Sequence, residues 1–203
     1  LLQSSGTKEF LKKSEQIYGS PNFVLRDGKT STLQLAKNFE ALIDSHLEHF
    51  SESLQVNPIP VANVKKNIEE RIQPIFGSKS PKIIVEDQLS AKATASSKRI
   101  RLRRGASFTN KDVDQLINHE AFIHVATTLN GRQQTNVKIL GAKTGSITKT
   151  QEGLAVFSEF ITGCIDVNRM YRISDRVIAI QMAIDGADFI EVYRFFLKRD
   201  GKT

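Results

Sequence analysis

The sequence is poor in cysteine and has no long apolar run. A single cysteine, Cys164, occurs among 203 residues, so no disulfide can form within the chain and we expect this thiol to be a small buried apolar group. The apolar runs are too short to cross a bilayer, and no secretory signal is visible. These features predict a cytoplasmic protein without a membrane partner. The chain begins with Leu1 rather than Met, so the missing signal carries little weight.

Repeats, low-complexity tracts and clear linkers are also missing. Hydrophobic residues make up 39% of the chain and charged residues 25%, which is ordinary for a folded globular protein. A chain of 203 residues suits one domain of good size. We therefore predict a single domain over residues 1–203, with a core fragment of a longer chain as the alternative.

Positive charge is in excess. The net charge is +7 and the pI is about 9.5, which favours an acidic partner such as nucleic acid, a membrane surface or an acidic peptide. The densest basic run, residues 98–104, contains no aromatic side chain on which a base could stack. We therefore expect no nucleic-acid partner, although a non-catalytic nucleic-acid-binding module remains an alternative.

Hydrophobic periodicity predicts a mostly helical α+β protein with a small sheet. We expect helices near residues 10–18, 32–54, 61–72, 110–129, 151–165, 168–184 and 188–197. We expect strands at residues 82–86 and 99–103, and loops at residues 87–97 and 131–149. Asn130-Gly131 is predicted to end one helix, and Thr150 to cap the next. Thr32 and Thr109 are further predicted caps, and Asp188 with Glu191 fits a capping box before the last helix.

The second predicted strand is basic on one face. Alternation places Arg99, Arg101 and Arg103 on one side and Ile100 and Leu102 on the other. As an edge strand it could pair with an extended substrate, and its arginines would favour acidic peptides. The alternative is a solvated edge whose charges discourage aggregation.

Two histidines and a glutamate lie within the helix predicted at residues 110–129. His119-Glu120 and His124 follow the pattern H-E-x-x-x-H, one residue longer than the H-E-x-x-H of zinc peptidases. In an α-helix, residues five apart point about 140° away from each other. A shared metal ion therefore predicts a π-bulge near residues 120–124. The alternative is an ordinary helix with one buried and one exposed histidine.

A further carboxylate could complete this site. Glu152 stands 33 residues after His119 at the start of another predicted helix, beside the small residues Gly153 and Ala155 that would permit close approach. Its oxygen would make a set of two histidines and one glutamate, with a fourth position open for water. Glu152 could instead be favoured only by its helix N-terminus.

Taken together, these motifs resemble a known family. The motifs are His119-Glu120-Ala-Phe-Ile-His124, Asn130-Gly131 and Gln151-Glu152-Gly153-Leu154-Ala155-Val-Phe-Ser-Glu159. They resemble the QEGLA-motif proteins, bacterial relatives of the vertebrate microtubule-associated tyrosine carboxypeptidases, and the similarity extends from near Phe10 to the end of the chain. Members of that family often continue further.

The resemblance implies a zincin-like metallopeptidase domain with a small β-sheet before the active-site helix. By position, His119, His124 and Glu152 would be the zinc ligands and Glu120 the catalytic base. Zinc would polarise its bound water, and Glu120 would accept the water proton and pass it to the leaving amine. The vertebrate members remove a C-terminal tyrosine from tubulin tails, so we expect a metallocarboxypeptidase acting on a peptide or protein C-terminal tail.

Substrate-binding groups follow less directly from the sequence. A carboxypeptidase needs a cation for the terminal carboxylate, and Arg169 and Arg176 follow the Glu152 helix. Either arginine could instead form a structural salt bridge. Tyr171 and Tyr193 are candidate oxyanion donors. A zinc endopeptidase and a relative that uses zinc only for structure remain alternatives.

Overall fold

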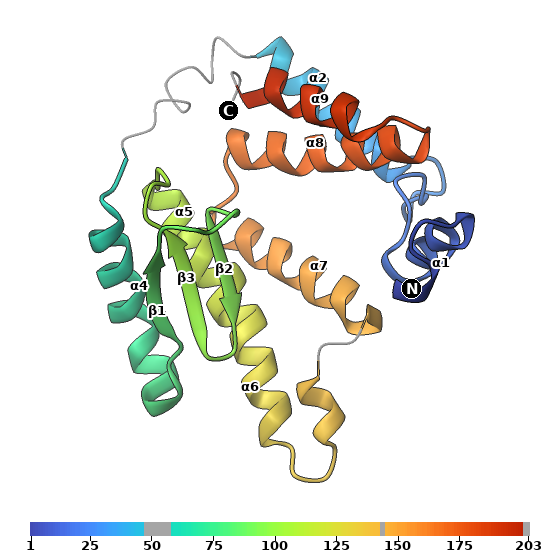
Figure 1. The fold of residues 1–203 in the computed structure, drawn as a ribbon. Coiled ribbons are helices and arrows are strands. Elements are labelled where there is room, and N and C mark those ends of the chain that lie inside the picture. Colours follow the sequence, from blue (N-terminus) through green and yellow to red (C-terminus); the bar gives the residue numbers. More distant parts are fainter. Residues whose placement is uncertain (47–57, 143–144, 201–203) are drawn as a thin grey trace. The chain divides into compact units, whose positions relative to one another are not determined.

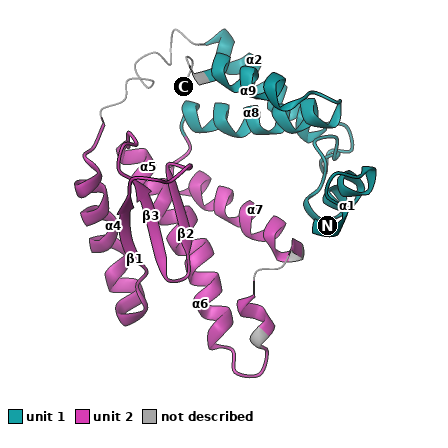
Figure 2. Ribbon diagram, in the orientation of Figure 1, with its two compact units in different colours: residues 1–55, 166–203 teal, residues 56–165 magenta. Residues whose placement is uncertain are grey.

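The chain forms two compact units. The computed structural model describes residues 1–46, 58–142 and 145–200 (Figure 1). Unit 1 consists of residues 1–55 and 166–203, and unit 2 of residues 56–165 (Figure 2). All four residues of the predicted metal site lie in unit 2. The prediction of a single catalytic domain is not tested by this division and stays a prediction.

Unit 1 is helical in its described part. Its elements are η1 (Leu2–Ser4), α1 (Lys8–Tyr18), α2 (Thr32–Ser45), α8 (Val167–Ile184) and α9 (Phe189–Asp200). Helices α2 and α9 both pack against α8. The Arg199 guanidinium on α9 pairs with Glu40 of α2 and, at 3.2 Å, with Asp175 of α8. This charge network therefore joins three helices of the unit.

Unit 2 holds the sheet and the predicted motif helix. Its elements are α4 (Val61–Phe76), η2 (Gly77–Lys79), β1 (Lys82–Glu86), β2 (Ala93–Ser96), β3 (Arg99–Arg103), α5 (Asn110–Gln115), η3 (Leu116–Val125), α6 (Ala126–Gln133), η4 (Lys138–Gly141) and α7 (Gly145–Ile161). The mostly helical α+β class predicted from the sequence is confirmed. Among the described helices of both units, none combines the length and apolar character that a membrane span requires.

The sheet corrects two sequence predictions. Its strand order is β1-β3-β2, with β3 parallel to β1 and antiparallel to β2 (Figure 1). Residues 93–96, predicted as loop, form β2, and the arginine-rich strand β3 is central rather than an edge. The prediction that residues 99–104 pair with an extended substrate is therefore wrong, because both sides of β3 are already hydrogen-bonded to neighbouring strands.

The alternation in β3 assigns the two faces of the sheet. Ile100 and Leu102 are fully buried and join one core with apolar residues of α4, α5 and η3. From α4 this core takes Val64, Ile68 and Ile72, which are all fully buried. The arginines of β3 lie on the opposite face, as alternation predicts. The apolar face thus holds η3 against the sheet.

A capping box begins the helix that leads to the predicted metal site. The Thr109 hydroxyl accepts from the Asp112 backbone N–H at 3.0 Å, and the Asp112 carboxylate accepts from the Thr109 N–H at 2.8 Å. Burial by itself would raise the pKa of Asp112, but the hydrogen bonds from Lys92 and Thr109 hold it below the ordinary value. The carboxylate therefore stays ionised, and the predicted cap is confirmed.

Several predicted helix ends differ from the observed ones. Helix α4 continues through Pro74 to Phe76, and Ser31 rather than Thr32 caps α2. Helix α7 begins at Gly145, so Thr150 lies inside it. The part of the second predicted helix at residues 47–54 falls outside the described residues. The Asp188–Glu191 capping box before α9 agrees with the prediction, with both bonds at 2.8 Å.

Gly131 does not end its helix, and its missing side chain serves another purpose. It lies inside α6, where a Cβ would stand 2.1 Å from the Leu140 carbonyl oxygen of η4. Gly141 faces back toward Arg132 in the same way, because a Cβ there would lie 2.6 Å from the Arg132 side chain. The two glycines therefore allow η4 to pack directly on α6.

Replacing Gly131 with alanine tests this close approach. We expect Gly131→Ala to lower the free energy of unfolding by about 1–3 kcal/mol, because the new methyl group meets rigid backbone. Gly153→Ala is the matched control, since it is also helical but a Cβ there has nothing within 4 Å. That control should raise stability by about 0.5–1 kcal/mol. Urea unfolding of both variants is the measurement, and an unchanged or higher stability of Gly131→Ala would contradict the packing.

Candidate metal centre

The helix that carries His119 and His124 is widened. Residues Leu116–Val125 form a π-helix, η3, between the α-helical segments α5 and α6. In a π-helix each backbone N–H hydrogen-bonds to the carbonyl oxygen five residues earlier. Side chains at positions i and i+5 therefore lie on the same side of the helix. The predicted departure from α-helix is confirmed, and it covers ten residues rather than a single bulge.

The widened turn brings the two imidazoles together. The rings of His119 and His124 have their centroids 5.0 Å apart and are inclined by 60°. His119 is buried and His124 is partly buried. The alternative of two histidines pointing apart on a straight α-helix is therefore excluded.

Glu152 reaches both rings from α7. One carboxylate oxygen lies 3.6 Å from His119 Nε2, and the other lies 3.5 Å from His124 Nε2. Glu152 is more than half exposed, at 55% for its side chain. The same nitrogen of each imidazole thus faces one carboxylate, which is the arrangement that a shared cation would require.

Glu120 lies at the side of this group. Its Oε1 is 3.9 Å from His119 Nε2, and its side chain is about a quarter exposed, at 24%. Candidate ligand atoms of His119, Glu120 and His124 all lie within 4.8 Å of one another. Glu120 is therefore close enough to act on a molecule held at the imidazoles.

The donor set fits a zinc ion. Zinc bonds of about 2.0–2.2 Å at the tetrahedral angle separate two ligand atoms by about 3.3–3.6 Å. Glu152 meets the two Nε2 atoms through different oxygens, at 3.6 and 3.5 Å, so its carboxylate lies within reach of an ion held by both imidazoles. Imidazole nitrogen and carboxylate oxygen are also the atoms that catalytic zinc sites use. The residues present could therefore hold the ion that the sequence predicts.

No role was assigned from the sequence to the last residue of the motif that begins at Gln151, which is a buried partner of His119. The Glu159 carboxylate is fully buried and accepts from His119 Nδ1–H at 2.5 Å. With the proton on Nδ1, the lone pair of Nε2 points to the candidate site. The signal for this residue was its spacing, because Glu159 follows Glu152 by seven residues and thus lies on the same face of α7.

His124 has a weaker partner. Its Nδ1 lies 3.4 Å from Gln151 Oε1, also on α7. That distance is at the outer limit of a hydrogen bond, and an amide oxygen carries no net charge. The orientation of His119 is therefore held more firmly than that of His124.

Helix α7 packs closely on η3 through one small residue. Ala155 is fully buried, and the two elements are in extensive contact. Gly153 is exposed and has open space where its Cβ would be. The predicted role of small residues is thus confirmed for Ala155 and wrong for Gly153, because Gly153 faces solvent.

Cys164 lies beside the same helix. It is buried, as predicted, and its sulfur accepts from the Asn118 side-chain amide at 3.3 Å. Asn118 also donates to the Asp114 carbonyl oxygen at 3.0 Å. Asn118 directly precedes His119, so these bonds help fix the start of the motif.

Comparison with known proteins supports the resemblance seen in the motifs. A model of the family described as "Microtubule-associated tyrosine carboxypeptidase" matches residues 1–203. The chain belongs to this family. Family membership implies a peptidase, and thus a hydrolase. Neither the curated proteins nor the solved structures contain a match.

The two arginines that the sequence predicted to bind substrate, Arg169 and Arg176, both lie in unit 1. Arg169 is buried and Arg176 is exposed, both on α8. Tyr171, a candidate oxyanion donor, is buried and donates to Asp44 at 2.5 Å. Burial and the Asp44 carboxylate raise the pKa of Tyr171, so its hydroxyl stays protonated. Tyr171 thus has a structural role in unit 1, and the substrate roles of both arginines stay predictions.

The contact between Glu159 and His119 gives a test for this family member. We expect Glu159→Gln to lower zinc affinity about 10–100-fold, because the neutral amide no longer strengthens the basicity of Nε2. Gln151→Ala, which removes the weaker partner of His124, should cost only a few-fold. Competition with a chromogenic chelator measures both variants. Wild-type zinc affinity in a folded Glu159→Gln protein would show that this carboxylate does not support the site.

Proposed function

We propose that this chain is a zinc metallocarboxypeptidase of zincin-like fold that removes C-terminal residues from peptide or protein tails. The observation that carries the proposal is the convergence of His119 and His124 on the Glu152 carboxylate across a π-helical turn. A π-helix of this length is rare, and such segments are frequent at functional sites. Membership of the family supplies the peptidase class.

Zinc is the cofactor that this donor set suits. His119, His124 and Glu152 would hold it. When bound, the ion would polarise a water molecule and the scissile carbonyl. The Glu152 side chain is more than half exposed, so the site can be reached from solvent.

Glu120 is the proposed general base. It follows His119 directly, and its Oε1 lies 3.9 Å from His119 Nε2. At that position it would accept a proton from the attacking water and transfer it to the leaving amine. His119 keeps its orientation during this exchange because its Nδ1–H is bonded to the buried Glu159.

The C-terminal tail is the proposed substrate, and an acidic tail is favoured by the charge of the chain. A net charge of +7 attracts acidic peptides over distances of about 8–10 Å at moderate salt. The binding group for the terminal carboxylate is proposed to be Arg169 or Arg176. A cytoplasmic location remains a prediction.

Exchange of Glu120 separates metal binding from catalysis. We expect Glu120→Gln to retain about one zinc per chain and to lose about 10²–10⁴-fold in hydrolysis rate, because the amide cannot accept the proton. Metal analysis and mass spectrometry of cleaved peptides are the measurements. A Glu120→Gln protein with normal activity would assign the base to another residue, and His119→Ala serves as the variant that should lose the metal as well.

The ends of the products distinguish a carboxypeptidase from an endopeptidase. We expect a peptide with a free C-terminus to lose single residues in succession, and the same peptide with an amidated C-terminus to resist cleavage, since the recognised carboxylate is gone. A zinc chelator should abolish the reaction, and added zinc should restore it. Mass spectrometry reads each product.

Internal cleavage of both peptides would instead show the zinc endopeptidase that the sequence left open. Salt-sensitive nucleic-acid binding without bound zinc would favour the non-catalytic binding module.

A further inference from the structure

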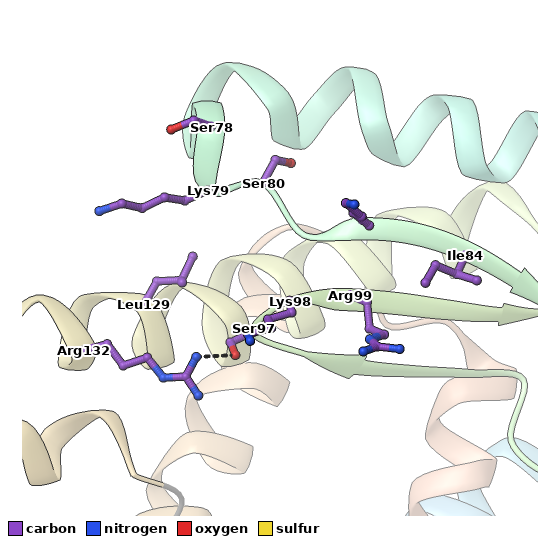
Figure 3. Close-up of a pocket in the computed structure, with 10 residues that line it drawn as sticks. Ser78, Lys79, Ser80, Ile84, Ser97, Lys98, Arg99, Leu129 and Arg132 are labelled. Atoms are coloured by element: carbon purple, nitrogen blue, oxygen red, sulfur yellow. Dashed lines mark hydrogen bonds between the residues drawn. The ribbon is translucent and has the colours of Figure 1, made fainter.

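Unit 2 contains a pocket lined by basic residues at one end of the sheet. The pocket has a volume of about 630 Å³ and lies where η2, the start of β1, the turn between β2 and β3, and α6 meet (Figure 3). Five of its lining side chains are cations: Lys79, Lys82, Lys98, Arg99 and Arg132. Of the described residues that line it, none is a carboxylate. We call this site the basic pocket.

The cations of the basic pocket lack acidic partners within the described part of the chain. No ion pair involves Lys79, Lys82, Lys98 or Arg99 there. The arginines nearer the other end of β3 differ, since Arg101 pairs with Glu86 and Arg104 with Asp87. Like charges gathered in a concave site focus a positive potential, which an anion from solution would neutralise.

Hydroxyl groups complete the lining. Ser78, Ser80 and Ser97 contribute neutral donors among the cations, and Arg132 donates to the Ser97 hydroxyl at 2.7 Å (Figure 3). Arginine forks, lysine ammonium groups and hydroxyls are the side chains that bind phosphate oxygens. We propose that the basic pocket binds a small ligand that carries two or more linked phosphate groups.

The size and charge of the basic pocket favour an oligophosphate over a single anion. A volume of about 630 Å³ falls within the range of about 300–1,000 Å³ typical of small-molecule sites. Five cations match several negative charges rather than one.

The basic pocket is separate from the candidate metal centre. Arg132 follows His124 by eight residues along the continuous helix η3–α6, which corresponds to about 12 Å along the axis. None of the residues that line the basic pocket is a proposed zinc ligand or the proposed base. Ligand binding can therefore be measured without disturbing the proposed catalytic groups.

Calorimetric titration with tripolyphosphate tests the proposal on the whole chain. The double variant Lys82→Gln with Arg99→Gln should bind tripolyphosphate at least about tenfold more weakly than the wild type, because two charge-assisted contacts are lost. The matched control is Lys65→Gln with Lys66→Gln on α4, which removes the same charge from exposed lysines outside the basic pocket. That control should change affinity less than about twofold.

Further arms of the titration define the ligand and guard against misfolding. A nucleoside triphosphate that binds more tightly than tripolyphosphate would assign the ligand as a nucleotide, and equal binding would assign it as a free oligophosphate; both support the proposal. Arg99→Lys, which keeps the charge, should retain most of the affinity. Circular dichroism should show that each variant is folded.

Three results would overturn the proposal. The first is that tripolyphosphate does not bind at physiological salt. The second is that the two double variants lose tripolyphosphate affinity equally. The third is that only single-stranded oligonucleotides bind tightly. Equal losses would mean attraction by net charge only. The oligonucleotide result would mean a nucleic-acid surface instead of a small-molecule pocket.

Discussion

The five-residue hydrogen-bonding pattern of η3 is the constraint on which the candidate metal centre depends. In an α-helix, His119 and His124 would point about 140° apart. The π-helical backbone over Leu116–Val125 removes that angle and places the two rings 5.0 Å apart. Such a helix is held by its surroundings, and here Ile117, Ala121 and Val125 are all buried. Packing on several sides thus stabilises a backbone that short peptides rarely adopt.

One hydrogen bond connects this helix to the rest of the centre. The buried Glu159 of α7 accepts from His119 at 2.5 Å, and its charge is compensated by that donor. The same helix carries Glu152 two turns earlier, so the contact that orients His119 also brings the third proposed ligand into place. Ala155 between them permits the close approach. The proposed ligand set is therefore a property of two helices fitted together.

The sheet divides unit 2 into an apolar and a basic side. Ile100 and Leu102 hold α4 and η3 through the core, while Arg99 and its alternate neighbours face the other way. Because β3 is the central strand, its backbone is hydrogen-bonded on both sides, to β1 and to β2. Its charged side chains remain available, and at one end they meet lysines and serines in the basic pocket. The same alternation that builds the core thus produces the proposed anion site.

Some of this could be predicted from local pattern, and some could not. The sequence predicted β1 and β3, the latter from its alternation, and a metal ion shared by His119 and His124 predicted a widened helix. Strand β2 escaped prediction because Ala93–Ser96 has weak strand character and is defined by pairing with β3. Gly131 was predicted to end a helix, because its actual role depends on the packing of η4 against α6. The sequence by itself determined the family, and its motif predicted the zinc-peptidase chemistry that we propose. Only the tertiary structure decided that Glu159 supports His119 and that five cations share one pocket, because these contacts join residues far apart in the chain.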